Sequence, residues 1–194
     1  IGMTTSMGLI VGTTGINVGH ELGHRSTRHE QFLAKLLLLP ALYLHFNIEH
    51  NRGHHKHVAT EADPTSARFG ESLYAFWLRS VFGSYRNAWK LEAQRLHREK
   101  KSALTMDNLM IQFQIAQVLY LVGVGLLFGW NIVPFAIVAA ISGFLLLESV
   151  NYIEHYGLRR MLLPNGRYEN VSPRHSWNSD HELGRIFLYE LTRH

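Results

Sequence analysis

Residues 109–129 read LMIQFQIAQVLYLVGVGLLFG and residues 132–147 read IVPFAIVAAISGFLLL, two stretches without a charged side chain. A membrane-spanning helix needs about 20 apolar residues, whereas an apolar run in a soluble core helix rarely exceeds about 14. Because only the turn Gly129-Trp130-Asn131 separates them, we predict a transmembrane helical hairpin with Trp130 at the membrane surface. A hairpin buried in a soluble core is the alternative, but a chain of 194 residues has few other elements to surround both helices.

Two further apolar segments precede this hairpin. Residues 1–19 (IGMTTSMGLIVGTTGINVG) carry no charge and are rich in Gly and Thr, small residues that let membrane helices approach closely. Residues 32–48 (FLAKLLLLPALYLHFNI) are interrupted by Lys35, Pro40 and His45, so they fit either a short span or an element that lies in or dips into the membrane surface. We therefore expect an all-α protein, an integral membrane helical bundle. No initiator Met or basic signal-peptide start is present, so we expect residues 1–194 to be an internal fragment, one domain incomplete at both ends.

Composition excludes several classes of protein. With 46% hydrophobic and 18% charged residues, the chain is not of the disordered type. It contains no Cys, which excludes a disulfide scaffold, a thiolate metal site and a Cys nucleophile. The basic residues behind the net charge of +4 lie in the polar segments and not in the 129–131 turn, so the positive-inside rule places those segments in the cytoplasm. No groove-reading motif accompanies them, and we expect no nucleic-acid partner.

Histidine is the unusual residue of this chain, with 13 in 194 residues. His20 and His24 are spaced i, i+4 in HELGH, which places both rings on one helix face within reach of one metal ion. In HNRGHH, the same α-helical geometry puts His50 and His54 on one face and His55 about 100° round, which suits a second ion beside the first. Sites built from imidazole without thiolate suit Zn, Cu, Fe or Ni.

The two histidine groups can share a site only if the apolar segment 32–48 between them does not cross the membrane. A crossing would place the groups about 30 Å apart on opposite faces. If the segment lies in the plane of the surface or re-enters, both groups face the cytoplasm, and the hairpin returns the chain to that side just before His155. We therefore predict that all six histidines converge in one cytoplasmic site.

Three motifs carry a resemblance to a known family: HELGHR at residues 20–25, EHNRGHHKHVATEADPTSARFGESLYAFW at 49–77 and LLESVNYIEHYGL at 146–158. Together they resemble the membrane-bound alkane 1-monooxygenase family, which belongs to the wider membrane non-haem di-iron group of desaturases and hydroxylases. The histidine spacings alone are shared across that group. The stretch 58–71 is much more specific to alkane hydroxylases, and the resemblance runs along nearly the whole chain.

The resemblance implies a site, a cofactor and partners. The implied cofactor is a pair of non-haem Fe ions with O₂ as co-substrate, and the implied reaction is terminal hydroxylation of medium- to long-chain n-alkanes to 1-alkanols. Rubredoxin, reduced by an NADH-dependent rubredoxin reductase, would supply electrons. The enzyme would lie among the lipids of the bacterial cytoplasmic (inner) membrane, with the di-iron site on the cytoplasmic side. The last of the implied ligands matches only the first histidine of the family's final histidine box; the set is His20, His24, His50, His54, His55, His155 and His194.

Other polar residues near the motifs receive simpler interpretations. Glu49 and Glu154 each precede an expected ligand, so we expect them to orient imidazoles by hydrogen bonding. Asp63 is expected to be a turn or cap residue. Basic residues predicted to dock an acidic electron carrier are Lys56, Arg68, Arg79 and Arg86. The histidines not expected to bind metal are His29, His45, His57, His97, His175 and His181.

Three alternatives remain open from the sequence. HELGH is also the HExxH signature of zinc metalloproteases, in which the Glu is the general base, but an intramembrane protease would leave most of the other histidines unused. A membrane metal transporter or sensor would use the histidines for binding alone. Within the di-iron group, a desaturase or an aryl-methyl hydroxylase shares the histidine spacings. Metal analysis separates the first of these classes, because two irons would support the oxygenase and one zinc the protease.

Overall fold

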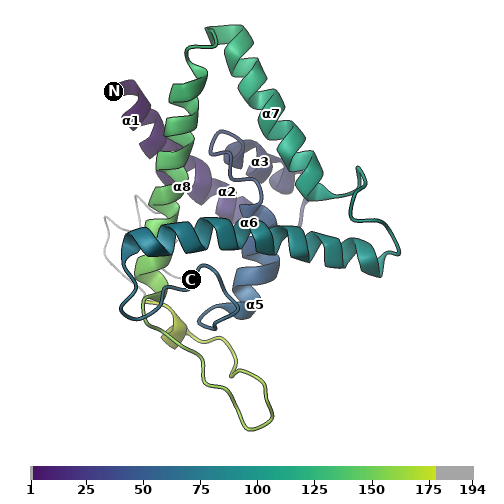
Figure 1. The fold of residues 1–194 in the computed structure, drawn as a ribbon, viewed down its shortest axis with the longest axis vertical. Coiled ribbons are helices and arrows are strands. Elements are labelled where there is room, and N and C mark those ends of the chain that lie inside the picture. Colours follow the sequence, from purple (N-terminus) through teal and green to yellow (C-terminus); the bar gives the residue numbers. More distant parts are fainter. Residues whose placement is uncertain (1, 178–194) are drawn as a thin grey trace.

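The computed structural model of the chain describes residues 2–177, and the regular structure of this part is helical (Figure 1). The described residues contain no β-strand, only an isolated bridge between Leu162 and Tyr168. The predicted all-α class is therefore confirmed. In chain order the elements are α1 (Gly2–Ile10), the π-helix η1 (Val11–Ile16), α2 (Asn17–Gly23), α3 (Arg28–Leu38), α4 (Phe46–Glu49), the π-helix η2 (His50–His54), α5 (His55–His57), α6 (Leu73–Arg98), α7 (Leu109–Phe128), α8 (Val133–His155) and the 3₁₀ turn η3 (Pro173–His175).

The two charge-free stretches form the predicted hairpin of long helices, α7 and α8, which is the inverted V at the top of Figure 1. The Asn108 side chain caps α7 by accepting a hydrogen bond from the Met110 N–H, and Gly129 ends the helix with a φ of +95°. Only 11% of the most apolar stretch of α7 and 28% of that of α8 are buried. Both helices are long and apolar enough to cross a membrane, and their exposed apolar surface does not fit a pair enclosed in a soluble core.

Small residues hold the first helix against α8. A Cβ at Gly12 would lie 2.9 Å from the carbonyl oxygen of Gly143, and a Cβ at Gly8 would lie 2.8 Å from the Cβ of Ser142. Neither contact is sterically possible, so the α1–η1 segment and α8 approach more closely than larger residues would allow. The close helix packing expected from the Gly-rich composition of residues 1–19 is confirmed.

The segment 32–48 does not form one continuous helix. α3 ends before Pro40, and Leu42 adopts a φ of +52° in the turn that follows. The short α4 then leads directly into η2, where His50 contacts His20 of α2. The chain thus returns to the side from which it came, as the convergence of the two histidine groups requires.

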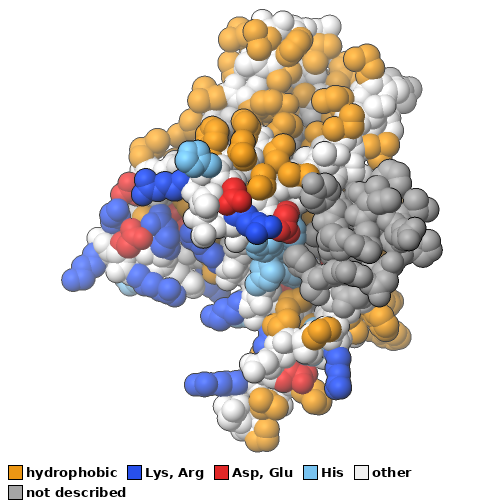
Figure 2. Space-filling view, turned by 180° about the vertical axis from the view of Figure 1, so that it is seen from behind, with side chains coloured by type: hydrophobic (Ala, Val, Ile, Leu, Met, Phe, Trp, Pro, Cys, Tyr) orange, Lys and Arg blue, Asp and Glu red, His pale blue; other side chains and the backbone are white. Residues whose placement is uncertain are grey.

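The long helix α6 lies across the polar ends of both hairpin helices (Figure 1). Near its start, Nε1–H of Trp77 donates to Oγ of Ser149 in α8 over 3.2 Å. Near its end, the Glu92 carboxylate accepts a hydrogen bond of 3.0 Å from the N–H of Leu109, the first residue of α7. Figure 2 shows the corresponding surface: hydrophobic side chains gather at the α7–α8 end, and charged side chains gather below them.

Candidate metal centre

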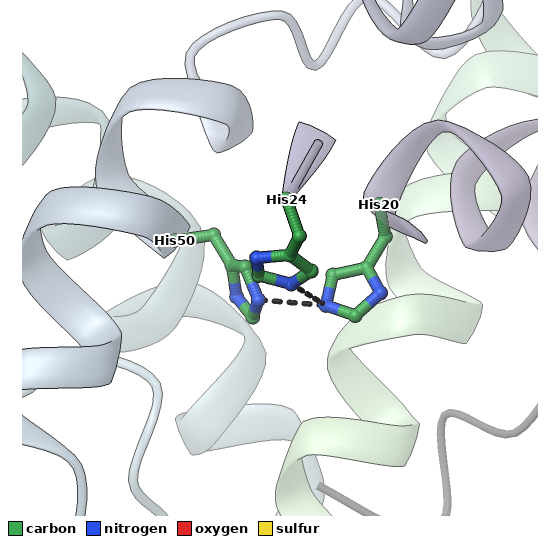
Figure 3. Close-up of side chains that lie close together, drawn as sticks. All are labelled: His20, His24 and His50. Carbon is green, nitrogen blue, oxygen red and sulfur yellow. Dashed lines mark hydrogen bonds between the residues drawn. The ribbon is translucent and has the colours of Figure 1, made fainter. Parts of the chain in front are cut away.

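The first pair of histidines lies where α2 ends the N-terminal apolar segment. His20 is buried and His24 is more exposed, and their Nε2 atoms are 3.0 Å apart. Nε2 of His20 also lies 2.7 Å from Nε2 of His50 on the returning segment (Figure 3). One ring nitrogen from each of these three side chains lies within 4.8 Å of those from the other two. The structure therefore brings together the two groups that the sequence separates by 26 residues or more.

A π-helical turn determines how the second group is arranged. In η2 each turn contains an extra residue, so residues five apart, and not four, align on one face. His55 Nε2 consequently lies 3.0 Å from His50 Nε2. His54 stacks beside His50, with ring centroids 5.2 Å apart, and its ring lies 4.9 Å from that of His155. α-Helical spacing predicts that His55 lies apart from His50, and the π-turn is the physical reason why the two rings meet instead.

His155 reaches the cluster from the end of α8. Its Nδ1–H donates to the backbone carbonyl of His175 over 3.1 Å, and both side chains are buried. With the proton on Nδ1, the ring lone pair is on Nε2, which is the form in which an imidazole binds a metal. Trp177 N–H donates to the carbonyl of Glu154 over 2.7 Å, so the chain after α8 folds back beside the site.

These six histidines fit a metal centre. Two nitrogens bound to one ion at about 2.1 Å and at right angles lie about 3.0 Å apart, and three nitrogen pairs in the cluster are separated by 2.7, 3.0 and 3.0 Å. A buried carboxylate oxygen, Oε1 of Glu154, accepts no hydrogen bond from the residues that the structure describes. A cation or its bound water would satisfy such an oxygen. The expected ligand His194 lies outside the described residues.

A buried aspartate fixes the orientation of His54. Oδ2 of Asp63 lies 2.9 Å from Nδ1 of His54, and Asp63 also accepts hydrogen bonds from the hydroxyl groups of Thr65 and Ser66. Burial by itself would raise the pKa of Asp63, but His54 and the two hydroxyl donors hold that pKa well below its usual range. Burial likewise opposes protonation of His54, yet the charge of Asp63 outweighs it and raises the pKa of His54 to about 9. Nδ1 of His54 therefore carries a proton, and Nε2 remains as the metal-binding atom.

A second buried carboxylate, that of Glu49, is hydrogen-bonded by a residue of α6. Nδ2 of Asn87 in α6 donates to its Oε1 over 3.1 Å, while burial and the nearby charge of Asp63 raise the pKa of Glu49 to about 7. A Cβ at Gly53 would lie 2.6 Å from Glu49 Oε1 and 2.7 Å from Asn87 Nδ2. A larger residue at position 53 would therefore require the Glu49–Asn87 pair or the π-turn to shift.

Comparison with known proteins agrees with this geometry. The fatty acid desaturase family model matches residues 1–194. The chain belongs to the fatty acid desaturase family. Within it, the chain is similar to Alkane 1-monooxygenase 2 of Pseudomonas aeruginosa (45% identical over 194 residues, 52% of that protein) and to Alkane 1-monooxygenase 1 of Alcanivorax borkumensis (44% over 194 residues, 48% of that protein). Both comparisons cover all of this chain, which spans about half the length of these relatives.

A more distant relative is the xylene/toluene monooxygenase hydroxylase component XylM of Pseudomonas putida, 29% identical over 194 residues, or 51% of that protein. The resemblance to alkane 1-monooxygenases that the three motifs carry is confirmed, because the identity extends from the motifs to the full chain. The buried histidine cluster with two candidate membrane helices is consistent with the membrane fold of this family.

Some polar residues of this desaturase-family site differ from the sequence-based expectation. Asp63 does form the predicted turn, since its Oδ1 accepts from Thr65 N–H over 3.0 Å, but its second oxygen orients His54. Oε1 of Glu154 accepts no hydrogen bond from the described residues, so the predicted orientation of an imidazole by this oxygen is not seen. His175 supports His155 through its backbone carbonyl, a role for which its side-chain type carries no signal.

The basic residues expected to dock a carrier divide into two kinds. Arg79 is part of the internal structure: its guanidinium donates to the carboxylate of Glu71 and to the carbonyl oxygens of Pro64 and Ser66, at 2.7 to 3.0 Å. It was therefore wrong to count Arg79 with the docking cations. The cations whose side chains are exposed are Lys56, Arg68 and Arg86.

The remaining histidines lie apart from the cluster of ring nitrogens. His45 is buried against Tyr43 and Tyr85, and burial lowers its pKa to about 4. His29 and His97 are exposed on α3 and α6, and His57 is half-buried at the end of α5. His181 lies outside the described residues.

Proposed function

We propose that the protein is an alkane 1-monooxygenase that hydroxylates the terminal methyl group of medium- to long-chain n-alkanes. The observation that carries this proposal is the 41–45% identity to alkane 1-monooxygenases along the whole chain. The chemistry agrees with it. An unactivated C–H bond offers neither a charge to bind nor a proton to abstract, so acid–base side chains cannot perform the reaction and a redox metal is needed.

The proposed cofactor is a pair of non-haem iron ions. Two neighbouring groups of rings support a pair, one around His50 and one formed by His54 and His155. When bound, the iron supplies the O₂ activation that places one oxygen atom in the product and the other in water. The balance is alkane, O₂, two electrons and two protons giving 1-alkanol and water. The residues that would hold the metal are His20, His24, His50, His54, His55, His155 and His194.

The apolar half of the molecule offers a place for the alkyl chain. A cavity of about 420 Å³ lies between α1, α7 and α8, with Met7, Val11, Tyr120 and Phe135 in its wall. An n-alkane dissolved in the bilayer can reach such an apolar cavity without passing through water. Phe46 contacts His20 with ring centroids 6.0 Å apart, so apolar side chains adjoin the metal site itself.

We propose rubredoxin, reduced by an NADH-dependent reductase, as the electron donor, docking on a cytoplasmic face of the bacterial inner membrane. A basic groove of about 480 Å³ between the η2–α5 segment and α6 supports this partner; its wall includes Arg52, Lys56 and Arg98. An acidic carrier is attracted to such a surface, which raises its association rate at low salt. The π-helix η2 carries the expected ligands His50 and His54 as well as Arg52 of the groove wall. A carrier bound in this groove would therefore contact the same short helix that holds the metal.

Product analysis of the full-length protein in its membrane tests the proposal. With octane, O₂, NADH, rubredoxin and its reductase, we expect 1-octanol, and we expect two irons per purified protein. His20→Gln should abolish both, whereas His97→Gln, at an exposed position of α6, should abolish neither. If the iron-loaded protein with a functioning electron-transfer chain formed no primary alkanol, the proposal would be contradicted. One zinc per protein in place of two irons would favour the protease.

Aryl-methyl hydroxylation is a second candidate, favoured by the similarity to XylM. A xylene also presents a methyl group to the metal, but its ring is wider than an alkyl chain. Measured side by side, a higher kcat/KM for p-xylene than for octane would favour this candidate over alkane hydroxylation.

A further inference from the structure

The outer face of α6 is apolar where a helix in contact with water would be polar. Every fourth residue is buried along the inner face, in the series Phe76, Ser80, Ser84, Ala88, Glu92 and Leu96. On the opposite face Tyr74, Leu78 and Phe82 are 73%, 65% and 66% exposed. Residues four apart lie above one another on a helix, so these three side chains form one stripe, which we call the outer stripe.

Two cations come next along this helix. Arg86 and Lys90 follow Phe82 at the same spacing, and both are exposed. Neither forms an ion pair with another residue in the range 2–177. A helix surface that passes from aromatic and aliphatic side chains to Arg and Lys matches the boundary of a bilayer, where acyl chains meet phosphate groups.

The contacts of α6 place it at that boundary. Trp77 binds Ser149 in the last part of α8, and Glu92 binds the first N–H of α7. The two contacts are separated by about 22 Å of helix, so α6 runs across the polar ends of both candidate spans. In Figure 1, α6 lies below the α7–α8 hairpin, and Figure 2 shows hydrophobic side chains gathered at the hairpin end and charged side chains below them.

We propose that the outer stripe of α6 binds the anionic phospholipid surface of the membrane. Tyr74, Leu78 and Phe82 would rest among the upper acyl chains, and Arg86 and Lys90 would contact lipid phosphate. This inference rests on α7 and α8 spanning the membrane and not on the reaction proposed above. The charges of Arg86 and Lys90 favour an anionic lipid surface over a purely apolar partner, because lipid phosphate attracts cations close to the membrane.

Lipid bound at the outer stripe would stabilise the position of α6, whose inner face contacts the segment that carries the metal ligands. The inner face of α6 donates Asn87 Nδ2–H to Glu49, the residue before His50, and the Ser80 hydroxyl to the buried Glu148 of α8. A helix anchored on its outer face holds these inner contacts in place. The stripe therefore connects the lipid surface to the segment that carries the histidines.

Site-specific probes can test the position of the stripe, because residues 1–194 contain no Cys. An environment-sensitive fluorophore is attached at Leu78→Cys in the full-length protein, with any cysteine elsewhere replaced by Ser. The reference positions are Val138→Cys, 52% exposed in the first third of α8, and Asn165→Cys, exposed on the polar side. In phosphatidylcholine–phosphatidylglycerol nanodiscs we expect nitroxide-labelled lipid to quench the probe at 78 to a degree between the two references. If aqueous iodide quenched the probe at 78 as strongly as the probe at 165, the proposal would be overturned. Protection of the probe at 78 from both quenchers would also overturn it, because another protein segment or a second copy would then cover the stripe.

A charge-reversal variant tests the anionic part of the inference. We expect Arg86→Glu/Lys90→Glu to lower the phosphatidylglycerol preference of co-purified lipid by at least about five-fold, the contribution of one interfacial cation. The matched control is Arg167→Glu/Arg174→Glu, which makes the same change in net charge at exposed positions far from α6 in the sequence. An equal loss of preference in both variants, or no loss in the first, would show that the stripe does not select anionic lipid.

Discussion

Asp63 and His54 form a buried pair in which Oδ2 lies 2.9 Å from Nδ1, directly behind the histidine cluster. The aspartate side chain is fully buried and its remaining hydrogen-bonding capacity is taken by Thr65 and Ser66. A carboxylate held this firmly determines both the tautomer and the direction of the imidazole.

Asp63→Asn should therefore weaken metal binding. The amide keeps the size of the side chain but loses the charge that makes Nδ1 a reliable donor, so we expect iron affinity to fall by about 10- to 100-fold. Iron content after dialysis against a graded chelator measures this directly. Glu61→Gln is the control, since that side chain is 76% exposed and makes only a 3.5 Å contact with Arg159. Unchanged iron retention in Asp63→Asn would show that the pair is not needed to orient the ligand.

Gly53→Ala should disturb the π-turn. The new methyl group would lie 2.6 Å from Glu49 Oε1 and 2.7 Å from Asn87 Nδ2, so the buried pair must separate or the turn must shift. Overpacking of this kind costs about 1–3 kcal/mol. Thermal unfolding in detergent measures the loss, and Gly123→Ala in α7 serves as the control because its Cβ would meet nothing within 4 Å. Equal melting temperatures for the two variants would contradict the proposed fit.

Arg79 should contribute to stability and not to docking. Arg79→Met removes the partner of Glu71 and leaves two carbonyl oxygens, of Pro64 and Ser66, without their donor. We expect a loss of about 1–3 kcal/mol. Arg86→Met, at an exposed position with no ion pair in the described residues, should cost much less. The affinity for rubredoxin, the proposed electron donor, should be unaffected by Arg79→Met when equal concentrations of folded protein are compared.

The same pair predicts a pH dependence. Hydrogen bonds from Arg79 lower the pKa of Glu71 below its ordinary value of 4.5. A depressed carboxyl pKa stabilises the folded state above the unfolded pKa, and this contribution is lost as the pH falls through the folded value. The difference in unfolding free energy between wild type and Arg79→Met should thus be constant near neutral pH and shrink below about pH 4. A difference that grows on acidification would have the wrong sign for this pair.

Much of the fold can be predicted from the sequence, because long stretches without charged residues indicate membrane helices. The helices that end at Phe128 and begin at Val133 could be predicted from their own residues, without knowledge of the segments they pack against. The return of the segment 32–48 was predictable for a different reason, since a crossing would have separated His24 from His50. What the sequence could not supply was the backbone form at residues 50–54, where a π-turn replaces the α-helical spacing and brings His55 to His50.

The supporting residues of the site were less predictable than its histidines. Asp63 sits before a proline, which already explains an aspartate locally, so its contact with His54 becomes visible only when the chain is folded. Arg79 looked like any other cation of an amphipathic helix, and its role depends on carbonyl groups 13 and 15 residues away. Contacts of this length leave no periodic signal in one sequence.

Glu21 distinguishes the oxygenase from the zinc protease that shares the HExxH pattern. In a protease this glutamate would face the metal as the general base, but here its side chain is 46% exposed and pairs with Arg25 over 3.0 Å. We expect Glu21→Gln to keep its iron and to hydroxylate octane within about two-fold of wild type, because an exposed i, i+4 pair contributes little. His24→Gln, three residues on, should lose iron because its Nε2 lies 3.0 Å from that of His20. Loss of hydroxylation in Glu21→Gln with iron content unchanged would give this glutamate the role that the geometry denies it.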